Sequence, residues 1–292
     1  MANFGPKDIK KLREMTDAGM MDCKQALAAT EGDMEKAVEW LRKKGLGAAA
    51  KKADKVAAEG TLAIKTDGNK AIMVEINSQT DFVAKNEKFQ SFVAEVVDHV
   101  MANDFDSVEE INASEIAGQS FADYLALQIA TIGENLVVRR YAKVVTDGSI
   151  GSYVHANGRV GVIVASDIEG AEGALKNIAM HAAAMNPSYI NEAAVPAEVI
   201  EKEKEIAKEQ LIKEGKPEAI LEKILPGKIK RFLQDNTLEN QKFVMDDKLT
   251  VGEYLKKNAN DAKLTEYVRF ELGEGVEKVE EDFAAEVAKQ MA

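Results

Sequence analysis

The chain has 292 residues and a formal net charge of −12, with 46% hydrophobic and 30% charged residues. These proportions are ordinary for a folded protein of two or three domains. The acidic balance argues against direct binding of nucleic acid, because phosphate recognition needs clustered Lys and Arg. No apolar run reaches the roughly 18 residues of a membrane span, and the N-terminal residues lack the apolar stretch of a secretory signal. We therefore expect a cytoplasmic protein with no membrane contact.

The supply of catalytic side chains is small. A single cysteine, Cys23, cannot form an internal disulfide or a thiolate metal site, and only three histidines are present. Cys23 falls on the apolar side of a predicted helix, which favours simple burial over nucleophilic chemistry. A GxGxxA match at residues 45–50 follows a helix instead of a strand, so the dinucleotide-binding interpretation is rejected. We expect no enzyme, no bound metal and no cofactor.

The first 55 residues form a basic region. They carry 12 Lys and Arg against 9 Asp and Glu, a net charge of +3, so the remaining chain carries −15. Apolar spacing predicts three short helices at residues 7–15, 21–30 and 34–44, with Gly45 ending the third. We assign residues 1–47 to a small partner-docking domain and residues 48–58 to a basic linker.

The next region changes to a strand period. Two short apolar segments flank Asp67-Gly68, which predicts a β-hairpin of residues 60–65 and 71–77. Helices are expected at residues 86–101 and 121–132, the latter ending at Gly133, and a strand at 136–145.

A short internal repeat links this hairpin to a later segment. Residues 60–74 resemble residues 151–164, and each copy reads as strand, turn and strand followed by a helix, at residues 86–101 and 171–185. This pattern predicts an α+β fold with two related core subdomains. The first spans residues 59–146, and the second combines residues 147–190 and 236–272.

The second copy is interrupted by a charged helical segment. Residues 191–235 alternate apolar positions with dense Glu and Lys around the turn at Gly215-Lys216-Pro217, which predicts an inserted antiparallel helical hairpin resembling a coiled coil. Strands are expected at 243–245 and 267–271, and residues 273–292 form a C-terminal module with an amphipathic helix at 276–291. The oligomeric state stays open, because a homodimer could form through the core or through the hairpin.

The segment from Ile76 to Ala84 connects the first hairpin to the next helix. On structural grounds, Thr80 or Asp81 could cap the helix near residue 86, and Phe82 could pack on its first turn. This interpretation gives the segment no function.

Five segments, taken in order along the chain, suggest a functional interpretation. They are LREMTDAGMMDCKQAL at 12–27, NSQTDFV at 77–83, IGEN at 132–135, HANGRVGV at 155–162 and RFELGEG at 269–275. Together they resemble the bacterial translation elongation factor Ts family. The chain departs from the family at Asp17, where the family favours Gly, and residues 104–120 match no motif.

The resemblance implies a fold and a function. It implies a ubiquitin-associated-like three-helix domain, two α+β core subdomains, an inserted helical hairpin and a C-terminal helical module. The function implied is that of a guanine-nucleotide exchange factor that binds elongation factor Tu, disrupts its Mg²⁺ and phosphate site, and promotes release of GDP.

The resemblance also implies which residues contact the partner. By family likeness, Thr80, Asp81, Phe82 and Val83 form the exchange wedge, in which Phe82 enters between helices of the GTPase domain and Asp81 lies near its Mg²⁺ and phosphate site. Secondary partner-binding positions by the same likeness are Arg13, Met20, Met21, Ile132, Gly133, His155, Phe283 and Val287.

Two other classes of function compete with this one. The chain could be an adaptor or scaffold that binds partners through the ubiquitin-associated-like domain, or an enzyme with a hidden site at Cys23 or His155. A GTPase that co-purifies with the chain and is lost on adding GDP would distinguish the exchange factor from both.

Overall fold

A computed structural model describes residues 4–16, 18–155 and 158–277. Helices and short sheets alternate in an α+β arrangement, as the sequence predicts. Two compact units are present, each containing separate stretches of the chain. Unit 1 contains the chain up to Ala63, Val74–Tyr141 and the residues from Glu271 onward, whereas unit 2 contains Ile64–Met73 and Ala142–Phe270.

Three helices begin unit 1. They are α1 (Pro6–Thr16), α2 (Met20–Ala29) and α3 (Met34–Ala50). The Asp33 carboxylate caps α3 by accepting the Lys36 N–H at 3.0 Å. The core of these helices includes Leu12, Cys23 and Leu27, and it also takes in Leu127 from α7 (Phe121–Ile132). The three predicted helices are therefore confirmed.

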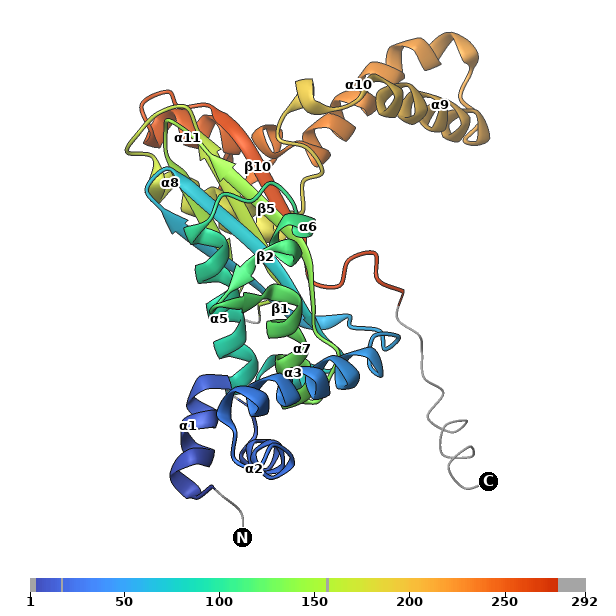
Figure 1. The fold of residues 1–292 in the computed structure, drawn as a ribbon. Coiled ribbons are helices and arrows are strands. Elements are labelled where there is room, and N and C mark those ends of the chain that lie inside the picture. Colours follow the sequence, from blue (N-terminus) through green and yellow to red (C-terminus); the bar gives the residue numbers. More distant parts are fainter. Residues whose placement is uncertain (1–3, 17, 156–157, 278–292) are drawn as a thin grey trace. The chain divides into compact units, whose positions relative to one another are not determined.

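The predicted helix end at Gly45 is wrong. Helix α3 continues to Ala50 and lies beside α7 (Figure 1). A Cβ atom at Gly45 would lie 3.3 Å from Leu127 Cδ2 and 3.4 Å from the Ala126 backbone. The missing side chain thus permits a close approach of two helices, and the helix tolerates the glycine at a cost of about 1 kcal/mol.

Each of the two larger sheets has three strands. The first is ordered β1 (Glu59–Asp67), β2 (Lys70–Ser78) and β5 (Val137–Val145). The second is ordered β10 (Leu264–Glu271), β7 (Val160–Ser166) and β6 (Ile150–Val154), with β6 and β7 antiparallel in a register that pairs Ile150 with Ala165. Both predicted hairpins are present. In each sheet the third strand lies beside the second strand of the hairpin.

Four helices and a small strand pair complete unit 1. They are α4 (Asp81–Ala84), α5 (Glu87–Ala102), α6 (Val108–Ala113) and α7, with β3 (Glu115–Ile116) paired to β4 (Gln119–Ser120). The predicted apolar stripe of α5 is buried from Phe89 to Val100. The sequence predicted no structure for residues 104–120, where α6 and the strand pair lie.

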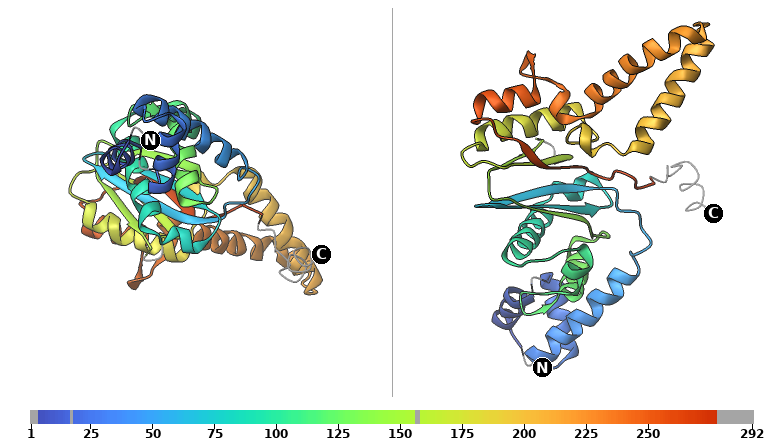
Figure 2. Two further views of the ribbon diagram at one scale, coloured as in Figure 1. Left: turned by 60° about the horizontal axis from the view of Figure 1, so that its bottom comes forward. Right: turned by 90° about the horizontal axis from the view of Figure 1, so that it is seen from above.

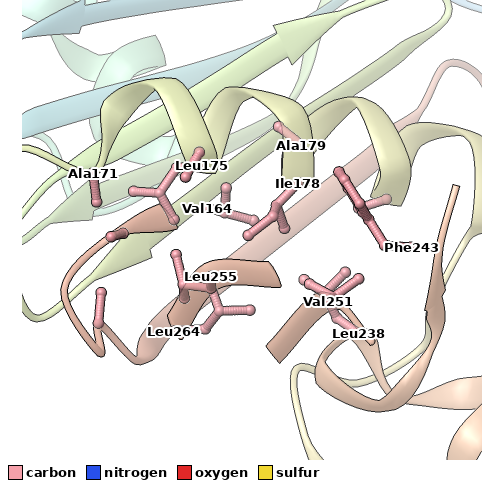
Figure 3. Packing of buried hydrophobic residues seen from close by; sticks show 14 of the residues in the cluster. Val164, Ala171, Leu175, Ile178, Ala179, Leu238, Phe243, Val251, Leu255 and Leu264 are labelled. Atoms are coloured by element: carbon pink, nitrogen blue, oxygen red, sulfur yellow. The ribbon is translucent and has the colours of Figure 1, made fainter. Parts of the chain in front are cut away.

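Unit 2 has a core between its sheet and two helices. Helix α8 (Glu172–Met185) directs Leu175 and Ile178 towards Leu255 and Leu264 (Figure 3). Leu255 belongs to α11 (Val251–Asn258), which the sequence analysis did not predict. The Thr-x-x-Glu pattern of a capping box is visible in the sequence at Thr250 and Glu253. In the structure the Thr250 hydroxyl accepts the Glu253 N–H at 3.2 Å, and the Glu253 carboxylate accepts the Thr250 N–H at 2.7 Å.

The predicted helical hairpin is present in unit 2. Helices α9 (Ala197–Lys213) and α10 (Glu218–Asn236) run side by side (Figure 2), and Ala207, Leu211 and Leu221 are buried. Pro226 lies inside α10 without ending it. The remaining short elements of this unit are two 3₁₀ helices, η1 (Glu192–Ala194) and η2 (Leu238–Asn240), and the strand pair β8 (Lys242–Phe243) and β9 (Asp246–Thr250).

The predicted C-terminal helix at 276–291, with Phe283 and Val287, falls almost entirely outside the described residues. Within the ranges that the structure describes, no helix is long and apolar enough to cross a membrane.

Candidate functional site

The connection from β2 to α5 exposes an aromatic side chain. Phe82 lies on the one-turn helix α4 and is 82% exposed, more than any other large apolar side chain among the described residues. The Thr80 hydroxyl caps this turn by accepting the Val83 N–H at 3.3 Å. Helix α5 has its own cap, Asn86, whose side chain accepts the Lys88 N–H at 2.9 Å. The predicted capping of the helix near residue 86 by Thr80 or Asp81 is therefore wrong, because Thr80 caps α4 and Asn86 caps α5.

The carboxylate of Glu134 fixes the start of this connection. One oxygen, Oε2, accepts the backbone N–H groups of Gln79 and Thr80, both at 3.0 Å. The other, Oε1, accepts the Thr80 hydroxyl at 2.7 Å. Glu134 lies in the IGEN segment, one of the five that carry the family resemblance, but the resemblance assigns it no role. The contact joins residues 54 and 55 positions apart, which no local pattern indicates.

Asp81 follows Thr80 and is half exposed. Its carboxylate accepts a hydrogen bond from the Lys85 ammonium at 2.8 Å, and this contact lowers the pKa of Asp81 below its ordinary value. Asp81 is therefore ionised at neutral pH. The turn of α4 presents an apolar ring beside a fixed negative charge.

The end of β2 contains an unusual buried polar group. Asn77 is fully buried, and neither its side-chain nitrogen nor its oxygen has a hydrogen-bond partner among the described residues. Such a group costs about 1–3 kcal/mol relative to a satisfied one.

Several of the other predicted positions lie in unit 1. Met20 and Met21, at the start of α2, are 61% and 64% exposed, and Arg13 on α1 is exposed as well. Neither methionine is therefore part of the buried core of the three helices. Ile132 ends α7 half-buried, and Gly133 caps that helix with a φ of +93°. This geometry places Glu134 directly after the helix and near Thr80.

His155 belongs to unit 2 and is exposed. It follows β6, its N–H donates to the Val160 carbonyl at 2.9 Å, and its Nδ1 lies 3.3 Å from the Tyr153 hydroxyl. A strand-end contact of this kind orients the ring without burying it.

The remaining histidines and the cysteine are structural. His181 is fully buried, accepts the Val244 N–H on Nδ1 at 3.2 Å and hydrogen-bonds Gln241 through Nε2 at 2.9 Å. Burial lowers the pKa of His181 and of His99, and it raises the pKa of the Cys23 thiol. Cys23 is therefore a protonated, buried group, as predicted.

Comparison with known proteins decides the family. The family profile described as "Elongation factor TS" matches residues 79–274. The chain is 50% identical to "Elongation factor Ts" of a Sulfurovum species over the full length of both chains, and 53% identical to that of a Nitratiruptor species over 97% of each. It is 47% identical to that of Halothermothrix orenii over 98% of this chain and 97% of the relative. The chain belongs to the elongation factor Ts family.

Membership in the elongation factor Ts family establishes the general function. The chain is a guanine-nucleotide exchange factor that acts on elongation factor Tu during translation elongation. Among the described residues, no group of three or more His, Cys, Asp or Glu side chains could hold a metal ion.

Proposed function

We propose that Thr80, Asp81, Phe82 and Val83 form the wedge with which this chain releases GDP from elongation factor Tu. The exposure of Phe82 on a capped helical turn supports the proposal most strongly. Single exposed apolar residues are common on protein surfaces, but aromatic side chains are enriched at protein interfaces, and this ring is almost fully available for burial in a partner. The turn is ordered before binding, so little conformational entropy is lost when the ring enters a partner.

The energetics of exchange follow from linkage. Burying Phe82 in the GTPase contributes about 1.5–3 kcal/mol to the complex. If that burial is available only in the nucleotide-free arrangement, it weakens GDP binding by the same free energy. No bond is made or broken, so the chain needs contact residues and no catalytic group.

Asp81 contributes through its charge. In elongation factor Tu, GDP is held by backbone amides at its β-phosphate and by a Mg²⁺ ion that bridges protein and phosphate. We propose that the ionised Asp81 carboxylate perturbs the ligand shell of that ion, because carboxylate oxygens are preferred Mg²⁺ ligands. The ion belongs to the partner.

The other positions form secondary contacts in this proposal. Exposed Met20 and Met21 on α2 suit an adaptable apolar contact, and exposed Arg13 on α1 suits a charged one, whereas Ile132 and Gly133 support the wedge. His155, Phe283 and Val287 are proposed as further contacts by family likeness.

The proposed organisation follows the sequence-based assignment. A ubiquitin-associated-like docking domain precedes two related α+β subdomains, an inserted helical hairpin and a C-terminal module, in a cytoplasmic protein. The repeated order of strand, turn, strand and helix supports the relation between the subdomains. Sedimentation of the purified chain distinguishes a monomer from a homodimer formed through the core or the hairpin.

The wedge is tested by substitution. We expect Phe82→Ala to slow release of a fluorescent GDP about 10–100-fold in stopped-flow measurements at fixed factor concentration, because a buried aromatic contact is lost. Asp81→Ala should slow release less.

Thermal unfolding provides the control for these variants. The midpoint of Phe82→Ala should match that of the parent chain, because Phe82 is 82% exposed and therefore contributes little to packing in the free protein. Unchanged GDP release by a folded Phe82→Ala variant contradicts the wedge. Binding to a partner that is insensitive to GDP would favour the adaptor function instead.

A further inference from the structure

Helix α4 is held by a residue that lies outside the wedge. Phe82 can act as a wedge only if this short turn keeps a fixed direction, and a single helical turn is not stable by itself. Its N-cap, Thr80, is therefore the point at which the direction is set. Both hydrogen-bonding groups of Thr80 that point away from the turn, its N–H and its hydroxyl proton, are directed to Glu134.

The chemistry at Glu134 is specific for a carboxylate. Three donors converge on it, namely the Gln79 N–H, the Thr80 N–H and the Thr80 hydroxyl. A carboxylate accepts all three, whereas the amide of a glutamine accepts only through its oxygen and turns its NH₂ group towards the Thr80 hydroxyl, which then has to accept instead of donate. Because the Thr80 hydroxyl donates to Glu134, its lone pairs remain available to accept the Val83 N–H that closes the turn.

Glu134 itself is placed on a rigid support. It follows Gly133, the C-cap of α7, and precedes Asn135, which is buried and donates to the Lys55 carbonyl at 2.8 Å. The Gly133 carbonyl accepts the Lys52 ammonium. The turn that carries Glu134 is thus fastened by α7 on one side and by the segment after α3 on the other.

We propose that Glu134 is a positioning residue for nucleotide exchange. Its carboxylate binds the three donors of Gln79 and Thr80 and holds α4 in the orientation that presents Phe82. Glu134 acts through Thr80 and does not itself need to touch the GTPase. This inference rests on the proposed function of Phe82, and it adds a residue that the wedge assignment does not include.

Two observables test the proposal. The first is hydrogen exchange of the Gln79 and Thr80 amides in the free chain, which reports the contact without any partner. The second is the rate of GDP release from elongation factor Tu at saturating factor. For Glu134→Gln we expect faster amide exchange confined to residues 79–85 and GDP release slowed about 5–50-fold, the range expected when a charge-assisted contact is lost. A general loss of stability would instead accelerate exchange in α7 as well.

A matched control and a coupling measurement sharpen the test. The control is Glu95→Gln. Glu95 lies on α5, and its carboxylate accepts a single hydrogen bond, from the Tyr124 hydroxyl on α7. This substitution should change neither the amide exchange of Gln79 and Thr80 nor the rate of GDP release. Thr80→Val should slow release as Glu134→Gln does, and the double variant should be slowed by less than the product of the two single effects, because the contact between the Thr80 hydroxyl and Glu134 is lost in both. Thr80→Ser should recover most of the rate that Thr80→Val loses.

The outcomes separate the two proposals. If Phe82→Ala slows release and Glu134→Gln changes neither release nor the amide exchange of Gln79 and Thr80, the positioning role is overturned. Additive effects of Thr80→Val and Glu134→Gln overturn it as well. If Phe82→Ala leaves release unchanged, the wedge fails, and the amide exchange still decides whether Glu134 holds the loop.

Discussion

Two connections in this chain follow the same local topology and differ in what they expose. Each leads from the second strand of a hairpin to a helix, residues 79–86 from β2 to α5 and residues 167–171 from β7 to α8. Each begins with a serine at the strand end whose hydroxyl donates to the carbonyl two residues later, from Ser78 to Thr80 at 3.0 Å and from Ser166 to Ile168 at 3.1 Å.

Beyond that serine the connections diverge. In the second, Ile168 packs on the core of unit 2, and the buried Ala171 N–H donates to the Ser149 hydroxyl at 2.9 Å. The first is three residues longer, and it contains the four-residue helix α4, on which Phe82 is exposed to solvent. The second connection shows that five residues suffice to join strand to helix. The extra turn of the first connection is the part that the proposed binding role of Phe82 uses.

The largest predicted effect concerns a glycine of the second copy. A Cβ atom at Gly151 would overlap the backbone of Leu175, so β6 and α8 can meet only without a side chain there. We expect Gly151→Ala to lower the free energy of unfolding by about 3 kcal/mol, because overpacking forces the helix to shift. Urea unfolding measures this. Gly47→Ala, in open space on α3, is the matched control and should be neutral or stabilising. Equal stability of the two variants would contradict the close contact.

The next prediction compares the two connections directly. Ile168→Ala should lower the free energy of unfolding by about 1–2 kcal/mol, because a partly buried side chain is lost from the core. Its GDP release rate, per folded molecule, should stay at the parent value. Phe82→Ala should instead keep the free energy of unfolding of the parent chain and lose GDP release activity. A loss of exchange activity in Ile168→Ala at full folding would remove the distinction between the connections.

The smallest predicted effect concerns His99 on α5 and His181 on α8, the helices that follow the two connections. Burial holds the pKa of His181 below its ordinary value of 6.5, and the folded ring stays neutral where the unfolded chain takes up a proton. Stability should therefore fall as pH decreases from about 7.5 to 5.5, because the unfolded state then binds more protons. His99 is only partly buried, and its pKa is lowered by the same cause.

Urea unfolding at pH 7.5 and at pH 5.5 measures how much each histidine contributes to the pH dependence of stability. His181→Gln should remove about 1 kcal/mol of the pH dependence, and His99→Gln should remove less. The same pH dependence in His181→Gln and in the parent chain would show that the buried ring titrates normally.

Much of this fold was readable from local patterns. The hairpins, α5 and α7 have clear apolar periodicity and end signals, and the sequence predicts their positions to within a residue or two. The end of α3 was not readable, because Gly45 is needed for a contact with Ala126 and Leu127 that no local pattern reveals. Helix α11 was readable from its Thr250 and Glu253 capping box but was not predicted.

The candidate site divides in the same way. The residue types of Thr80 to Val83 suggest a capped turn, and only family likeness suggested that Phe82 functions in binding. The structure adds the exposure of Phe82, which the sequence could not give because an aromatic residue at such a position is equally able to pack on the helix. Glu134 was beyond sequence reasoning, since its partners Gln79 and Thr80 are distant in the chain.

The most direct test of the central claim is to locate Phe82 in the complex. Phe82→p-benzoylphenylalanine should cross-link to the GTPase domain of elongation factor Tu on irradiation, most strongly without nucleotide and weakly with excess GDP. The same photoreactive residue at Glu169, exposed on the second connection, is the control and should give no such cross-link. A complex that forms normally but yields no cross-link from position 82 to the GTPase domain would contradict the account.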